Sequence, residues 1–273
     1  MVRLLCQPAT PERQAKYRLP KASVEIVDAD ALMGLFGEVV GGIREALGTV
    51  EDWGLTGIRA TQYHHDVAAD QVALDQLLGA GLGVLSEETG LQHGDRDVVV
   101  VVDPIDGSTN ASIGLPWFAT SLCAVRNGVP EVALVVNLAS GETFDAIAGR
   151  GARRNGEPLV AGTVVPLSDA VVAISGLPPE HPGWAQFRCY GAAALDIASV
   201  ASGVFDGFVD WSVDAHGVWD YLGAMLICHE AGAPCVDAHG RDLVVLDHEA
   251  RRTPVAATDD LLLTALLDRR QTH

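Results

Sequence analysis

The first half of the chain contains one long helical pattern followed by a series of short apolar runs. Between positions 28 and 48, apolar residues recur at steps of three and four, which predicts an amphipathic helix. A second helix is predicted over 69–78, where apolar side chains follow similar spacing. The apolar runs after it predict strands over 82–85, 98–103, 118–125, 131–138 and 143–147.

The second half alternates strands and helices. Strands are predicted over 170–174, 204–211 and 254–257, and helices over 192–202, 219–232 and 259–267. This alternation indicates an α/β protein, with an α+β half at residues 1–162 and an α/β half at residues 163–273. Residues 1–22 show no periodicity, so we expect them to form a loosely held arm.

Five consecutive valines, at 98–102, predict a strand that is buried on both faces. Pro104 favours an extended Asp103, so we expect this strand to end at Asp103. Asp106 follows three residues later, and Gly107 allows a sharp turn. Two carboxylates this close repel each other unless a divalent cation neutralises them, and oxygen ligands favour Mg²⁺, Ca²⁺ or Mn²⁺. The alternative is an ordinary turn, because Asp-Pro and Asp-Gly are common turn dipeptides.

The segment VVVVVDPIDGSTN, at 98–110, closely resembles the main motif of the inositol monophosphatase family of magnesium-dependent, lithium-sensitive phosphatases. A second segment, HGVWDYLGAMLICHEAG at 216–232, resembles the family's Trp-Asp…Glu-Ala-Gly pattern. The resemblance covers roughly residues 66–240. It implies an α/β fold, a layered α-β-α-β-α sandwich of the inositol monophosphatase and fructose-1,6-bisphosphatase type, with the metal site between the two halves.

The resemblance also implies which residues bind metal. Two or three Mg²⁺ ions would be held by side chains and one backbone carbonyl, those of Glu87, Asp103, Ile105 (carbonyl), Asp106 and Asp220. Without the resemblance, Glu87 reads as part of a solvated acidic turn. Asp220 reads as an acid that complements the dipole of the helix it begins.

Catalytic and substrate contacts follow from the same resemblance. In the family, an aspartate before the second helix orients the attacking water, and the best match is Asp70, acting with Ser108 and Glu87. The groups expected to contact the phosphate or the substrate are Gly107, Ser108, Thr109, Gly191, Ala192 and Asp210. Asp214 is the fallback for Asp210. Ala192 stands where the family has a hydroxyl residue, so its side chain cannot donate a hydrogen bond.

Some of these residues also have structural interpretations. Asp70 could simply complement a helix dipole, and the small residues Gly191 and Ala192 could serve close helix packing. Arg59 stands where the family often has a lysine, and its contribution stays open. His64 and His65 are interpreted as structural or surface residues, since neighbours on a strand point to opposite faces.

Composition limits the choice of partners and compartment. The 273 residues include 18 basic and 36 acidic side chains, a net charge of -18 that disfavours nucleic acids and anionic membranes. No segment predicts a signal peptide or a membrane span, so we expect a cytoplasmic protein. The cysteines lack a C-x-x-C pair and are expected to be reduced and mostly buried; they are Cys6, Cys123, Cys189, Cys228 and Cys235.

The function implied by the resemblance is Mg²⁺-dependent hydrolysis of a small phosphate monoester, with an inositol or sugar phosphate as the preferred substrate class. Alternatives within the family are fructose-1,6-bisphosphatase, histidinol-phosphatase and 3′-phosphoadenosine-phosphate phosphatase activities. An alternative of another class is a catalytically silent, regulatory or binding member. The family often forms homodimers, so a homodimer is implied here, while the substrate, the oligomeric state and the number of metals stay open.

Overall fold

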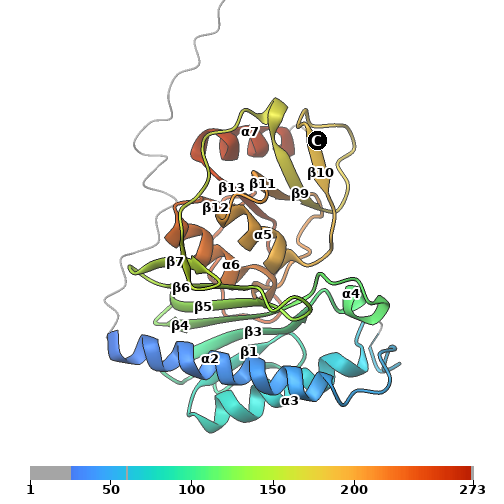
Figure 1. Cartoon of the computed structure of the whole chain (residues 1–273), viewed down its shortest axis with the longest axis vertical. Coiled ribbons are helices and arrows are strands. Elements are labelled where there is room, and N and C mark those ends of the chain that lie inside the picture. The colour runs from blue at the N-terminus through green and yellow to red at the C-terminus, as the bar shows by residue number, and fades with distance from the viewer. Residues whose placement is uncertain (1–25, 60, 272–273) are drawn as a thin grey trace, which may run out of the picture.

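The structure is a computed structural model that describes residues 26–59 and 61–271. Its elements form five layers (Figure 1): two helices, an eight-stranded sheet, two central helices, a five-stranded sheet and a final helix. This arrangement confirms the predicted α-β-α-β-α sandwich. The expected arm at 1–22 and Cys6 lie outside the described residues.

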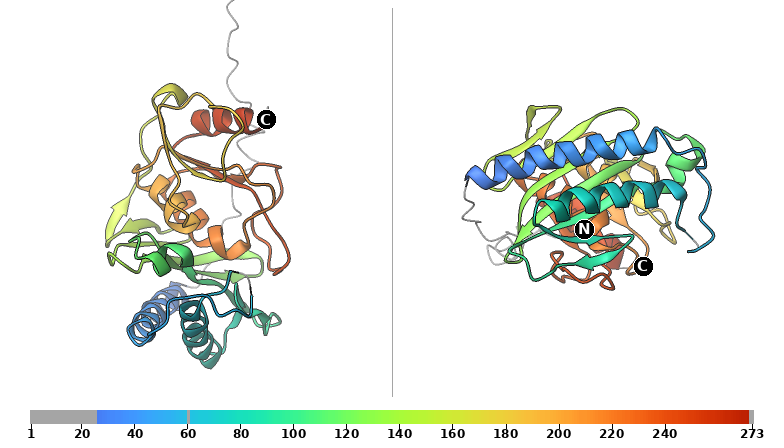
Figure 2. Two further views of the ribbon diagram at one scale, coloured as in Figure 1. Left: turned by 90° about the vertical axis from the view of Figure 1, so that its right-hand side faces the viewer. Right: turned by 90° about the horizontal axis from the view of Figure 1, so that it is seen from below.

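The outer helices of the first layer are α2 (Ile26–Leu47) and α3 (His64–Gly79). They lie side by side across one face of the first sheet (Figure 2). The predicted start of α3 at residue 69 was wrong by five residues, because His64 to Val67 carry no continuous apolar stripe. Tertiary contacts and an N-terminal cap at Tyr63 set the beginning of the helix instead.

The first sheet has the strand order β2-β1-β3-β4-β5-β6-β7-β8. Its strands are β1 (Gly83–Ser86), β2 (Gly90–Gln92), β3 (Val98–Asp106), β4 (Ala119–Arg126), β5 (Val129–Asn137), β6 (Thr143–Ile147), β7 (Gly151–Arg154) and β8 (Glu157–Leu159). β1 and β3 pair in parallel, and the other neighbours are antiparallel. The strand β2 was not predicted, because three residues are too few to show a hydrophobic period.

Every residue of β3 is buried, as the run of valines predicted. The strand does not end at Asp103: it continues through Pro104 to Asp106, with a shift in its register against β4. An irregular stretch of this kind tolerates a proline, which cannot donate a ladder hydrogen bond. The short helix α4 (Ser108–Ile113) follows, where a turn was expected.

The second sheet has the order β10-β9-β11-β13-β12. Its strands are β9 (Val171–Ser175), β10 (Gln186–Arg188), β11 (Gly207–Asp210), β12 (Cys235–Asp237) and β13 (Pro254–Ala257). A 3₁₀ turn, η1 (Leu167–Asp169), precedes β9, and α7 (Asp260–Gln271) covers the outer face of the sheet. The short strands β10 and β12 were not predicted.

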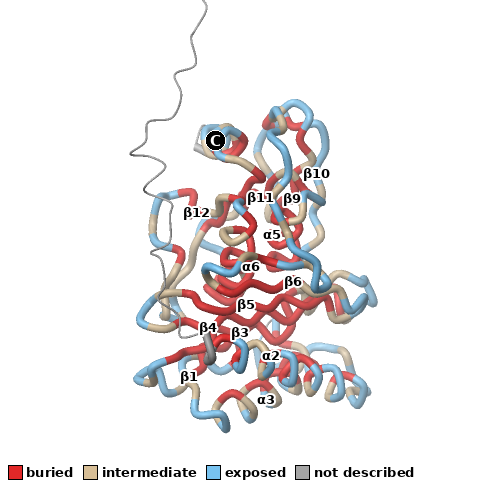
Figure 3. The backbone as a smooth tube through the Cα atoms, turned by 60° about the vertical axis from the view of Figure 1, so that its left-hand side comes forward, coloured by how far each residue is buried: buried red, intermediate tan, exposed pale blue. Residues whose placement is uncertain are grey.

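The central helices are α5 (Ala193–Ala201) and α6 (Val218–Ala231), and they pack between the two sheets. One large apolar cluster includes side chains from both helices and both sheets, and the buried segments gather there (Figure 3). The two parts of the chain thus share one core, and their division at 162/163 stays a prediction.

Two further expectations concern the whole chain. Cys123 and Cys228 are buried, Cys235 is half-buried and Cys189 is exposed, and none of these four forms a disulfide. Across the described ranges, no helix combines the length and the apolar character that crossing a bilayer requires.

Candidate metal and phosphate site

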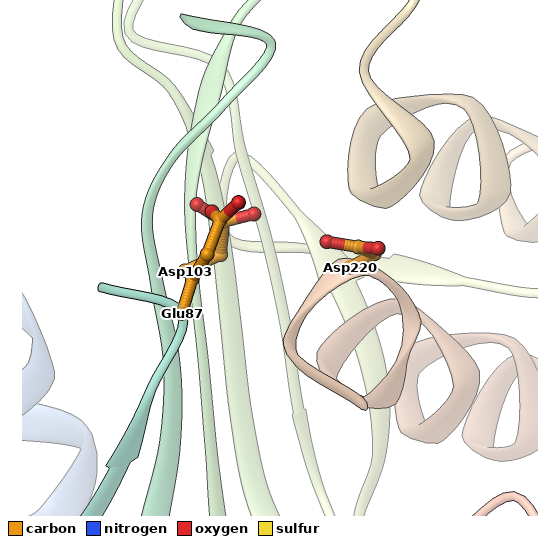
Figure 4. Close-up of side chains that lie close together, drawn as sticks. All are labelled: Glu87, Asp103 and Asp220. Carbon is orange, nitrogen blue, oxygen red and sulfur yellow. The ribbon is translucent and has the colours of Figure 1, made fainter. Parts of the chain in front are cut away.

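Three carboxylates from distant parts of the sequence meet at one place (Figure 4). The parallel pairing of Ser86 with Val102 places the next residue of each strand at the same sheet edge, so Glu87 lies beside Asp103. Asp220 approaches from the first turn of α6. One carboxylate oxygen of each of the three lies within 4.8 Å of the other two.

A cavity of about 200 Å³ surrounds these carboxylates. Its walls come from loops and element ends of both halves, namely Thr61, Tyr63, Asp66, Glu87, Glu88, Asp103, Ile105, Asp106, Gly107, Ser108, Thr109, Gly191 and Asp220. All five residues predicted to bind metal are present, with four of the six predicted to contact phosphate or substrate. Asp70, Ala192 and Asp210 do not line the cavity.

The site disfavours the ionised forms of two of these acids, Glu87 and Asp103. Burial, followed by the charges of Glu87 and Asp106, raises the pKa of Asp103 well above its usual value. Burial and the charge of Asp220 do the same for Glu87. Among the described residues, nothing donates a hydrogen bond to the buried Oδ1 of Asp103. An all-oxygen donor set with a buried acceptor lacking a partner fits a hard divalent cation.

Asp106 connects the two halves of the site. The first amides of α5 donate to its carboxylate, Ala193 N to Oδ1 at 3.2 Å and Ala194 N to Oδ2 at 2.6 Å. Burial and the charge of Asp220 raise its pKa, while the Ala194 hydrogen bond lowers it. These bonds fix the orientation of Asp106 relative to the second half.

Gly107 lies against the second half of the chain, next to Ala192 and Gly191. Its φ of 90° lies in the left-handed region that favours glycine. A Cβ added there would lie 3.1 Å from Ala192 Cβ and 3.1 Å from the carbonyl oxygen of Trp117. The turn into α4 therefore requires glycine for its backbone conformation and for its packing. Beside it, the Ser108 hydroxyl donates to the Ile105 carbonyl at 2.8 Å.

The structure places Asp66, not Asp70, in the cavity. Asp70 is buried and accepts a hydrogen bond from the Ser86 hydroxyl. Asp66 accepts a hydrogen bond from Tyr63 N at 2.9 Å through Oδ2. Burial raises the pKa of Asp66 to about 6, against the lowering effects of the Tyr63 amide and the Ser108 hydroxyl. The prediction chose Asp70 because the helix was started too late; an acid three residues after a capping position was the signal that was missed.

His64, His65 and Arg59 were singled out in the sequence without a place in the site. His64 and His65 lie in α3, so the argument from a strand was wrong, although His65 is structural: it is fully buried against Trp53 and Tyr63. Arg59 pairs with Glu88 at 3.4 Å. Glu88 lines the cavity and Arg59 does not, so the arginine contacts one of the cavity residues without lining the cavity itself.

The predicted substrate acceptor Asp210 is fully buried outside the cavity. Its Oδ1 accepts a hydrogen bond from Ser212 N at 2.8 Å, and its Oδ2 lies 3.8 Å from His216 Nε2. Burial raises its pKa to about 6, although the charge of His216 lowers it. The fallback Asp214 pairs with Arg241 at 2.7 Å and does not reach the cavity either.

Ala192 is a structural residue in this fold. It is fully buried at the N-terminal cap of α5, where it packs against Gly107. Gly191, one residue earlier, lines the cavity as expected. Sequence reasoning had treated the two as a pair, but the chain turns into α5 between them.

Several contacts at the rim were not anticipated. The Tyr63 hydroxyl lies 3.1 Å from the hydroxyl of Thr109. Asn110 Nδ2 donates to the carbonyls of Trp117 and Tyr190, both at 2.7 Å. His248 Nε2 lies 2.9 Å from the carbonyl oxygen of Glu87. The last two residues tie loops of the second half to the metal-binding segments of the first.

Comparison with known proteins agrees with this arrangement. The model of the inositol monophosphatase family matches residues 60–271. The chain is 34% identical over 193 residues to Nus factor SuhB of Escherichia coli (strain K12), covering 64% of this chain and 71% of that protein. It is 31% identical over 209 residues to the fructose-1,6-bisphosphatase/inositol-1-monophosphatase of Thermococcus kodakarensis, covering 74% and 80%.

Solved structures share the fold. The extragenic suppressor protein suhB from Bartonella henselae superposes with a TM-score of 0.74 at 26% identity, covering 88% of this chain and 99% of that one. A hypothetical protein from Pyrococcus horikoshii with similarities to inositol-1 monophosphatase gives a TM-score of 0.80 at 23% identity, covering 88% and 98%.

Proposed function

Because the chain belongs to the inositol monophosphatase family, we propose that it is a Mg²⁺-dependent phosphatase that hydrolyses a small phosphate monoester. One observation supports this proposal above the others. Glu87, Asp103 and Asp220 come from three separate elements and bring carboxylate oxygens within 4.8 Å of one another. So many mutually repelling acids in one cavity are expected where a cation balances them.

The ligands proposed for two or three Mg²⁺ ions are Glu87, Asp103, the Ile105 carbonyl, Asp106 and Asp220. All of them line the same cavity. Mg²⁺, when bound, supplies positive charge that stabilises a phosphoryl group under attack and makes water more acidic.

Side chains and backbone amides of the protein would orient the attacking water and bind the phosphate. Asp66 replaces Asp70 in our proposal as the acid that orients the attacking water, because it lines the cavity and interacts with Ser108. Phosphate oxygens would accept hydrogen bonds from backbone amides in the turn formed by Gly107, Ser108 and Thr109. Amides in the first turn of a helix have no acceptor within that helix, so they are available to an anion.

For the substrate we propose an inositol or sugar phosphate. Thr61, Tyr63 and Thr109 line the cavity, and hydroxyl side chains can exchange hydrogen bonds with the hydroxyl groups of such a molecule. The printed name of the Thermococcus kodakarensis relative, a fructose-1,6-bisphosphatase/inositol-1-monophosphatase, fits this class.

A second function is suggested by the relatives named Nus factor SuhB, a name that describes a factor instead of an enzyme. A binding role of this chain would leave the cavity without a catalytic purpose. Phosphate release from purified protein separates the two.

The experiment measures phosphate released from a panel of monoesters, with Mg²⁺ or with EDTA. The panel contains inositol 1-phosphate, fructose 1,6-bisphosphate, histidinol phosphate and 3′-phosphoadenosine 5′-phosphate. Asp103→Asn is compared with Asp97→Asn, which changes an exposed aspartate just before β3 begins. Loss of a metal ligand should cost more than the roughly 10–100-fold that loss of a supporting residue costs.

We expect release that requires Mg²⁺, survives in Asp97→Asn and disappears in Asp103→Asn. Release that continues in EDTA, or at an unchanged rate in Asp103→Asn, contradicts the proposed metal site. A folded protein that releases no phosphate from any of the four esters favours the binding role.

A further inference from the structure

His216 lies between the second sheet and the acid cluster, two residues before α6 begins. Its backbone is held on both sides by Arg252: His216 N donates to Arg252 O at 3.3 Å, and Arg252 N donates to His216 O at 2.9 Å. The ring packs edge-on against Phe208, with centroids 6.4 Å apart. The imidazole is therefore fixed in place before any ligand binds.

One nitrogen of this ring faces Asp220. His216 Nδ1 lies 3.1 Å from Asp220 Oδ2, and the same oxygen accepts a hydrogen bond from Gly217 N at 2.9 Å. Both of these contacts are made to Oδ2, and no described residue donates a hydrogen bond to Oδ1 of Asp220. With the Gly217 amide and the His216 ring both at Oδ2, Oδ1 is the oxygen available to a cation.

The other nitrogen faces the second sheet. His216 Nε2 lies 3.1 Å from Ser175 Oγ and 3.8 Å from Asp210 Oδ2. Ser175 and Asp210 are paired in the parallel register of β9 and β11, at the carboxyl ends of those strands. Asp210 Oδ2 is buried and receives no hydrogen bond from any described group.

We propose that His216 is a positioning residue for Asp220, supported in turn by Ser175 and Asp210. This inference rests on the proposed metal-dependent function and concerns the metal ligand that comes from the second half. It also gives Asp210 a role that its burial allows. Hydrogen bonds of this kind, from a second residue to a metal-binding carboxylate, orient the ligand and sustain metal affinity.

A direct role of His216 as a ligand does not fit the contacts. Both ring nitrogens already have oxygen partners, Asp220 on one side and Ser175 on the other. His216 is also absent from the residues that line the cavity. The geometry therefore assigns the histidine to the support of Asp220.

The test measures Mg²⁺ affinity directly, by isothermal titration calorimetry on metal-free protein without substrate. His216→Ala should bind Mg²⁺ about 10–100-fold more weakly than the wild type. His216→Asn should recover most of the affinity, because its amide nitrogen reaches roughly the place of Nδ1 and can donate to Asp220. His216→Gln should remain weak, because its amide reaches toward Ser175 instead.

The control is His239→Ala, which removes an exposed histidine two residues after β12. This variant should bind Mg²⁺ as tightly as the wild type does. Thermal unfolding of each variant in EDTA checks that the fold is kept. Ser175→Ala, which removes only the support for Nε2, should weaken Mg²⁺ binding less than His216→Ala.

The inference is overturned if His216→Ala binds Mg²⁺ with wild-type affinity, or if the Asn and Gln variants recover equally. In either case the proposed function stands, because the wild type still binds the ion. A wild-type protein that binds no Mg²⁺ overturns the proposed function and this inference together.

Discussion

The two halves of the protein hold their acids in different ways. In the first half, Glu87 and Asp103 are placed by the parallel pairing of β1 with β3, and Asp103 Oδ1 is buried without a hydrogen-bond partner among the described residues. In the second half, Asp220 begins a helix, and its Oδ2 receives hydrogen bonds from Gly217 N and approaches His216 Nδ1. Strand pairing therefore positions Glu87 and Asp103, whereas contacts with an amide and a side chain position Asp220.

This difference separates two requirements of a metal site. The parallel strand pair brings the charges of Glu87 and Asp103 together without balancing them, so these two acids depend on a cation. A helix start supplies amides and a favourable dipole, so Asp220 is stabilised before the ion arrives. The first set should govern whether metal binds at all, and the second should govern how well the ligand is oriented.

The largest effect that we expect is on phosphate release, and it compares two acids of the first half, Asp66 and Asp70. Asp66 lines the cavity, whereas Asp70 lies outside it and accepts a hydrogen bond from Ser86. Asp66→Asn removes the acid proposed to orient water, and we expect phosphate release to fall by about 10²–10⁴-fold. Asp70→Asn should cost far less, because an amide oxygen can still accept the Ser86 hydrogen bond. Steady-state release with saturating Mg²⁺ measures both.

Asp75→Asn is the matched control, an exposed position on the same helix that should leave the rate unchanged. A greater loss for Asp70→Asn than for Asp66→Asn would restore the assignment made from the sequence and remove the distinction between the acid in the cavity and the acid outside it.

The next effect concerns stability without metal. Burial and neighbouring charges raise the pKa of Asp103, so the folded protein keeps this proton to higher pH than the unfolded chain does. The free energy of unfolding therefore falls as pH rises above the usual aspartate value. Asp103→Asn cannot ionise, and at about pH 8 it should be more stable than wild type by about 1–4 kcal/mol in EDTA. Thermal unfolding should show a midpoint at least about 2 °C higher.

Asp220→Asn gives the other side of the comparison. Its carboxylate already has donors, so we expect no gain in stability from this variant in EDTA. Added Mg²⁺ should raise the midpoint of the wild type and not that of Asp103→Asn. If both substitutions stabilise equally, the two halves do not differ in the way that the contacts indicate.

The smallest effect concerns the contact between the two regions. Gly107→Ala places a Cβ at φ 90° against Ala192 and the Trp117 carbonyl, whereas Gly114→Ala has a φ of 75° and open space around it. Both should lose about 1–2 kcal/mol from backbone strain. Gly107→Ala should lose more, up to about 3 kcal/mol, because its neighbours must also shift.

The midpoints of denaturant unfolding measure the loss of stability in each variant. The difference between the two losses excludes the backbone strain that both variants share. Equal losses would mean that α5 yields freely at its N-terminal cap. The contact between Gly107 and Ala192 would then contribute nothing to how the two halves are held.

The sequence predictions were correct where residues close together in the chain decide the structure, and they failed where contacts between distant residues decide it. The valine strand, the long helix and the turn at Gly107 were predicted because a few neighbouring residues decide them. Asp66 was missed because the start of α3 depends on a cap and on packing, and an error of five residues moved the helix past it. Asp210 was assigned to the substrate from the family resemblance, and its position outside the cavity depends on how the two sheets stack, which no local pattern records.

The sequence by itself determined the family motifs, the strand that delivers Asp103 and Asp106, and the helix that begins near Asp220. These are local matters of side-chain branching, proline and glycine geometry, and periodicity. Only the tertiary structure decided which acids face one cavity and which are held away from it. That choice depends on contacts such as those of His216 with Asp220 and of α5 with Asp106. Local sequence patterns do not record how these residues are oriented in space or which distant residues meet.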